Sequence, residues 1–291
     1  MQNGYWVIRT YISGNVGEKI KYWVSGNKPV RSKRRVTSDV NKVEKNEKQS
    51  EKNLARILNT NFGAQGGVLV GLDYSDEAYK KLFGGCKDLQ EVIECAKHQA
   101  SLCLRRVQRE AKKRGVEVKA AIVTADLDGE TKESVRVHHH IVVNSEAAEL
   151  FGEKWKHGKT ADYEYLYNDQ KDRTPLAHYL MSQISHIHGG KAYITTKNLE
   201  RPKCIDRIAK NGSEISLPKN SALIYRSAHA AGLNQYLRYM ILEDSQARSD
   251  ERDEVACGDG VFFFSRRLKK NDPSPKEGAQ KMDLSPNTEV N

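Results

Sequence analysis

Three consecutive histidines, His138, His139 and His140, lie inside an apolar run over residues 135–144. The run has the length and the β-branched composition of a strand. Because side chains alternate between the two faces of a strand, His138 and His140 share one face, whereas His139 points to the other face with its apolar neighbours. Two imidazoles on one face of a rigid strand can bind one divalent cation. The spacing therefore predicts metal-assisted chemistry that uses His138 and His140.

The composition of the chain favours a polyanionic partner. The 291 residues carry a formal net charge of +10, and the isoelectric point is about 9.2. Nucleic acid is the commonest partner of such a chain, and a membrane surface is the alternative. No run reaches the apolar length that spans a bilayer, and the first six residues lack a signal-peptide pattern. We expect a soluble, cytoplasmic protein that does not enter a membrane.

The five cysteines indicate neither a zinc ribbon nor a disulfide framework. They are scattered along the chain, and none forms a Cys-x-x-Cys pair. A reducing compartment is consistent with this spacing.

The hydrophobic pattern around the histidines predicts an α+β fold, in which an antiparallel sheet is flanked by helices. Strands are expected over residues 68–74 and 116–124, and a helix is expected over 88–114. The histidine strand follows a turn and pairs with 116–124 as an antiparallel neighbour. With helices packed on one face of this sheet, we expect the opposite face to remain free for the histidines and a ligand.

The flanking segments are divided by composition. Residues 1–58 are expected to form a β-hairpin and a basic helical segment, and residues 59–205 the catalytic domain. Residues 206–264 are interpreted as a helical extension, with one helix around 232–242, and residues 265–291 as a disordered tail. A basic stretch in the first segment is a candidate for contact with the DNA backbone, and it contains Lys33, Arg34 and Arg35.

Four pieces of the chain, taken in order, resemble the HUH endonuclease superfamily, and more narrowly the rolling-circle replication initiators of phages and small plasmids. Together they cover about residues 60–203. The pieces are Asn61-Phe62 with the strand 68–74, Val137-His138-His139-His140-Ile141, Leu176-Ala177-His178-Tyr179-Leu180, and Lys197-Asn198-Leu199-Glu200-Arg201-Pro202.

The resemblance implies roles for individual residues in an HUH/RRM-like catalytic domain. Tyr179 is the expected nucleophile, and His138 and His140 are expected to bind Mn²⁺ or Mg²⁺ with no nucleotide cofactor. In the family a carboxylate or amide on a neighbouring strand completes the metal site. Asp126 is our first choice for this third ligand and Glu130 is the alternate. DNA contacts are expected from Lys33, Arg34, Arg35, Lys197 and Arg201.

The implied reaction is transesterification of single-stranded origin DNA, with a 5′-phosphotyrosine link and later rejoining of the strand. The expected partners are origin DNA, a host helicase and a host polymerase, in the cytoplasm of a bacterial host. A transposase or relaxase with one tyrosine uses the same chemistry and is an alternative. A non-catalytic DNA-binding protein with a structural metal is the alternative from another class. Packing or base stacking is the simpler interpretation of Tyr163, Tyr165 and Tyr167.

Overall fold

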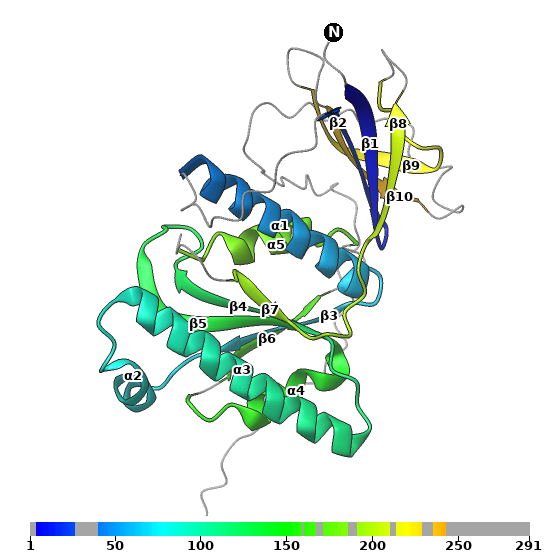
Figure 1. The fold of residues 1–291 in the computed structure, drawn as a ribbon. Helices are drawn as coiled ribbons and strands as arrows, with labels where there is room; N and C mark the ends of the chain where they lie inside the picture. The colour runs from blue at the N-terminus through cyan, green and yellow to red at the C-terminus, as the bar shows by residue number, and fades with distance from the viewer. Residues whose placement is uncertain are drawn as a thin grey trace, which may run out of the picture. The chain divides into compact units, whose positions relative to one another are not determined.

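A computed structural model describes residues 4–26, 40–158, 160–166, 171–185, 191–209, 214–228 and 235–242. These residues form an α+β fold with two antiparallel sheets (Figure 1). The basic stretch of Lys33, Arg34 and Arg35 and the predicted tail lie outside the described residues. Within the described part of the chain, no helix has the length and apolar character needed to cross a bilayer.

The histidine strand is the central strand of sheet B, whose order is β6-β3-β5-β4-β7. The strands of this sheet are β3 (Gly67–Leu72), β4 (Ala120–Leu127), β5 (Ser134–Val143), β6 (Thr160–Leu166) and β7 (Tyr193–Thr195). In the register of β4 and β5, Val123 lies opposite His140 and Thr124 lies opposite His139. A central strand is fixed by neighbours on both edges, so β5 is a rigid support for the histidines.

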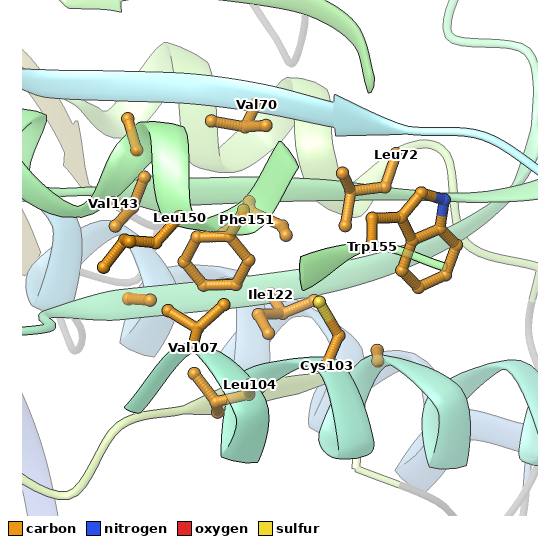
Figure 2. Close-up of a cluster of buried hydrophobic side chains, with 14 of the residues drawn as sticks. Val70, Leu72, Cys103, Leu104, Val107, Ile122, Val143, Leu150, Phe151 and Trp155 are labelled. Carbon is orange, nitrogen blue, oxygen red and sulfur yellow. The ribbon is translucent and has the colours of Figure 1, made fainter. Parts of the chain in front are cut away.

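Helices cover both faces of sheet B, which corrects the expectation that one face is free (Figure 1). The helices are α1 (Val40–Phe62), α2 (Asp76–Phe83), α3 (Leu89–Arg114), α4 (Ser145–Lys154) and α5 (Thr174–Met181). On one face α3 and α4 close a large apolar core, as Figure 2 shows for Leu104 and Val107 of α3 and Leu150 and Phe151 of α4. On the other face α1 and α5 pack on Ala121, Val123 and Val142.

The sequence of α1 hid its role as a core helix. Its first half is almost entirely charged or polar, but Leu54, Leu58 and Phe62 are buried against the sheet. The signals of α3 were clearer. The Asp88 side chain accepts from Glu91 N at the start of α3, and Gly115 ends the helix with a φ of 70°. The predicted helix over 88–114 is thus confirmed.

Sheet A joins the two ends of the described chain, in the order β8-β1-β2-β10-β9. Its strands are β1 (Gly4–Ser13), β2 (Val16–Ser25), β8 (Lys203–Ala209), β9 (Ser221–Ala228) and β10 (Gln235–Ile241). The predicted N-terminal hairpin is confirmed by the pairing of β1 with β2. The predicted helix around 232–242 is wrong, because β10 occupies this segment and pairs with β2 and β9. The helical interpretation of 206–264 is therefore corrected to strands where the structure describes it.

One buried ion pair links sheet A to α1. Arg56 of α1 donates from Nε to Glu18 Oε2 of β2 at 2.6 Å, and the Tyr236 hydroxyl of β10 donates to Glu18 Oε1 at 2.8 Å. The Arg56 guanidinium also lies 3.6 Å from the centroid of the Tyr11 ring. Both oxygens of the buried carboxylate therefore have partners, which is the condition for burying a charge without a large penalty.

Candidate active site

The side chains of His138 and His140 meet on the face of β5 that α5 covers. Their Nε2 atoms lie 3.1 Å apart, and their ring centroids are 4.8 Å apart. His138 Nδ1 donates to the Arg136 carbonyl at 3.0 Å, which leaves the lone pair of His138 on Nε2. Burial lowers the pKa of His140 to about 4, so this ring is neutral at neutral pH. A neutral imidazole is the form of histidine that binds a cation.

His139 faces the opposite side of the sheet, as the alternation of a strand predicts. Its side chain is fully buried, and its ring nitrogens lie 2.7 Å from the Tyr74 hydroxyl and 3.1 Å from Thr124 Oγ1. Burial, the largest cause, lowers the pKa of His139 to about 3, and the nearby His138 and His140 add to the effect. A neutral, fully hydrogen-bonded histidine in the core is a structural residue.

The third side chain of this cluster is Gln183, which was not predicted from the sequence. Its Oε1 lies 3.0 Å from His140 Nε2. Its Nε2 donates to the Tyr179 carbonyl at 3.3 Å, which fixes the orientation of the amide. The signal in the sequence is the spacing of four residues from Tyr179, because residues i and i+4 share one face of a helix.

Tyr179 lies beside this cluster. Its ring centroid is 6.1 Å from that of His140, and the residue is 45% exposed. On another side the ring touches the turn between β4 and β5, since a Cβ added to Gly129 would lie 3.0 Å from Tyr179 Cε2. Lys132 of the same turn donates from Nζ to the Gly129 carbonyl and the Ser182 carbonyl at 2.5 and 3.3 Å. The turn therefore contacts the C-terminal end of α5 next to Tyr179.

The structure places Asp126 against the segment after α5. Asp126 N and Leu127 N both donate to the Gln183 carbonyl, and Asp126 Oδ1 accepts from Ser185 N at 2.8 Å. Among the described residues, no three His, Cys, Asp or Glu side chains come together as a metal-binding group. Asp126 is fully buried. Its Oδ1 holds the segment that carries Gln183, whereas its Oδ2 has no hydrogen-bond partner among the described residues.

The other predicted residues have different settings. Glu130 is exposed in the turn, where its backbone N donates to Asp128 Oδ1. Lys197 and Arg201 are exposed on the segment between β7 and β8. This segment is attached to α1, because Glu200 N donates to Asn61 Oδ1 at 2.9 Å and Asn61 Nδ2 donates to the Glu200 carbonyl at 3.1 Å. The first and last pieces of the family resemblance are thus in contact.

The donor set fits a divalent cation. Two ligand nitrogens on one metal with bonds of about 2.1 Å lie about 3.0–3.4 Å apart, and the Nε2 atoms of His138 and His140 are 3.1 Å apart. Gln183 would add an amide oxygen, which suits Mn²⁺ or Mg²⁺ better than a soft metal.

Comparisons with known proteins do not add to this description. No family model, curated protein or solved structure matches the chain.

Proposed function

We propose that the chain is an HUH-type endonuclease that nicks and rejoins single-stranded DNA by metal-assisted tyrosine transesterification, and that it initiates rolling-circle replication. One observation carries the proposal: Tyr179 of α5 lies beside the His138 and His140 pair of β5, with the ring centroids of Tyr179 and His140 6.1 Å apart. The Gln183 amide lies beside the same pair, with its Oε1 3.0 Å from His140 Nε2, which supports this role for the cluster. The net charge of +10 favours such a partner.

In this proposal His138, His140 and Gln183 hold the cation. When bound, the cation polarises the scissile phosphate and offsets the charge on its non-bridging oxygens. Gln183 has two functions, because the same amide that reaches His140 also donates to the Tyr179 carbonyl. The chain thereby couples the position of the cation to the position of the helix that carries the nucleophile.

Tyr179 performs the covalent step. Its oxygen attacks the phosphorus, a new bond forms between phosphorus and the tyrosine oxygen, and the bond to the 3′-oxygen breaks. The phenol proton ends on the released 3′-oxygen, which becomes a hydroxyl. The number of phosphoester bonds is unchanged, so a later 3′-hydroxyl can reverse the attack and rejoin the strand. The free 3′ end meanwhile would serve as a primer for a host polymerase.

The proposal is tested by trapping the covalent intermediate. The chain is incubated with Mn²⁺ or Mg²⁺ and with single-stranded DNA of its own genetic element that is labelled at the 3′ end. A labelled adduct on a denaturing gel is expected, and mass spectrometry is expected to locate it on Tyr179. Tyr179→Phe should abolish the adduct and leave DNA binding nearly intact. Tyr165→Phe is the matched control, because Tyr165 is a 63% exposed tyrosine on β6.

Two outcomes would contradict the proposal. An adduct that persists in Tyr179→Phe would move the nucleophile to another residue. DNA binding without nick or adduct, in the presence of either metal, would favour a non-catalytic DNA-binding protein.

A further inference from the structure

The two faces of sheet A differ in what covers them. The face that carries Glu18 and Tyr11 receives Arg56 of α1. The opposite face, here called the Trp6 face, carries Trp6, Ile8 and Thr10 of β1. On the Trp6 face the register places Lys19 opposite Thr10 and Arg207 opposite Ile8. Cations thus lie on both sides of β1.

The Trp6 face contains a cavity of about 240 Å³ between the strands and the segment 214–216. Its walls are mostly apolar and include Ile8, Ile205 and Ile215, and its polar edge includes Lys19 and Arg207. One carboxylate, that of Glu214, also lines it. The space is several times the volume of about 30 Å³ that one water occupies in the liquid. A flat, partly apolar group with an attached anion matches this lining.

Two observations indicate that an anion belongs at the polar edge. Within the described residues Arg207 makes no ion pair, whereas the nearby Arg9 donates two hydrogen bonds of 2.7 Å to Asp206 on the other face. Lys19 Nζ donates to the Ser216 carbonyl at 2.8 Å, which holds it at the cavity. Burial lowers the pKa of Lys19, and the charge of Arg207 lowers it further, so a phosphate between them would relieve their repulsion.

The Trp6 face also carries an exposed aromatic residue, Trp23. Trp23 lies opposite Trp6 in the register, is 39% exposed, and has its ring centroid 5.2 Å from that of Trp6 in an edge-to-face pair. An aromatic ring beside a row of cations is the pattern by which proteins bind single strands, with bases stacked on rings and phosphates on cations.

We propose that the Trp6 face of sheet A is a second binding surface for single-stranded DNA, in which Lys19 and Arg207 contact a phosphate and Trp23 stacks on a base. The identity of DNA as the ligand rests on the proposed function. Such a surface would hold the strand independently of the nicking site, so that the DNA remains bound when the phosphotyrosine link is absent.

The test measures binding of the full chain to a dye-labelled oligothymidylate of about 20 nucleotides by fluorescence anisotropy. The test variant carries Lys19→Gln and Arg207→Gln, and the control variant carries Lys112→Gln and Lys113→Gln at exposed positions in the last turn of α3. Each phosphate contact to a single strand contributes about 0.7 to the salt slope. The proposed site holds one phosphate, so the test variant should lose about 0.7 of the slope, which is about 5-fold in affinity at 0.1 M salt.

A second measurement detects the stacking. The chain has three tryptophans, and Trp155 is buried in the core of sheet B. Oligothymidylate should quench the tryptophan fluorescence of the natural chain, and Trp23→Phe should remove most of this quenching. A thermal melt of each variant shows whether it is folded.

The results separate this inference from the proposed function. An unchanged affinity and salt slope in the Lys19 and Arg207 variant would overturn the inference, and adduct formation at Tyr179 would still stand. Equal competition by duplex DNA of the same length would overturn the assignment to single strands. Charge-dependent binding to the Trp6 face in a chain that forms no adduct would support the inference and contradict the proposed nicking activity.

Discussion

The three histidines are expected to respond differently to alanine substitution, because alternation along β5 gives them different environments. His139 is fully buried and lies within hydrogen-bond distance of Tyr74 and Thr124, whereas His138 is partly exposed. We therefore predict that His139→Ala mainly reduces the free energy of unfolding. His138→Ala should mainly reduce metal binding.

The magnitude follows from two contributions at His139. Removing a large buried side chain costs about 2–5 kcal/mol in transfer and cavity terms. The Tyr74 hydroxyl and Thr124 Oγ1 each lose a partner, and a buried unsatisfied group costs about 1–3 kcal/mol. These terms overlap, because the cavity admits relaxation of the neighbours, so we expect about 3–5 kcal/mol. For a chain of this size the midpoint should fall by about 6–20 °C.

The assay is thermal and urea unfolding followed by circular dichroism, with binding of Mn²⁺ measured on the same preparations. His139→Phe serves as a second variant, because it keeps an aromatic ring and removes both hydrogen bonds. It should cost less than His139→Ala. His138→Ala should change the free energy of unfolding by less than about 1 kcal/mol. The reasoning is refuted if His139→Ala unfolds like the natural chain and loses metal binding.

Three further predictions concern the region around Tyr179. Gln183→Ala should weaken binding of Mn²⁺ by about tenfold or more, and Gln183→Glu should strengthen it by adding a negative charge. Titration calorimetry measures both affinities. If both variants bind Mn²⁺ as tightly as the natural chain, Gln183 is not a ligand. Asp126→Asn should leave the affinity for Mn²⁺ unchanged, because an amide oxygen still accepts from Ser185 N, and a large loss of affinity would restore Asp126 as a ligand. Gly129→Val should slow adduct formation by about tenfold, because a Cβ at this position would touch the ring of Tyr179. Single-turnover assays measure this rate. A rate equal to that of the natural chain would show that the turn moves aside.

Elements with strong local signals were predictable from the sequence. The helix over Leu89–Arg114 has a capping Asp88 and a terminating Gly115, and the structure uses both. The assignment of the three histidines to two faces required only the alternation of a strand, and the burial of His139 confirms it. These predictions depend on residues within one element, so no knowledge of distant contacts was needed.

Elements that depend on distant partners were missed. The segment Gln235–Ile241 has a tyrosine-rich, alternating pattern that fits a strand, but its partner in the first hairpin, β2, lies more than 190 residues earlier in the sequence. The core role of α1 was also hidden, because its apolar residues are confined to one stripe near the end of a charged helix. As a result, one face of sheet B was predicted to be open, although α1 and α5 cover it.

The positions of Asp126 and Gln183 were also difficult to predict, because they depend on contacts between distant segments. A carboxylate at the C-terminal end of β4 was expected to face the histidines. However, the pairing of β4 with β5 shifts register between Ala125 and Leu127. A bulge changes the direction of the side chains that follow it. Asp126 therefore bonds to Ser185 N, and its backbone N binds the Gln183 carbonyl. The carboxylate that was expected to bind the cation also anchors, through Oδ1, the segment that brings the Gln183 amide to His140. The position of Gln183 beside His140 is thus set by tertiary hydrogen bonds, which the residue types at the strand end do not reveal.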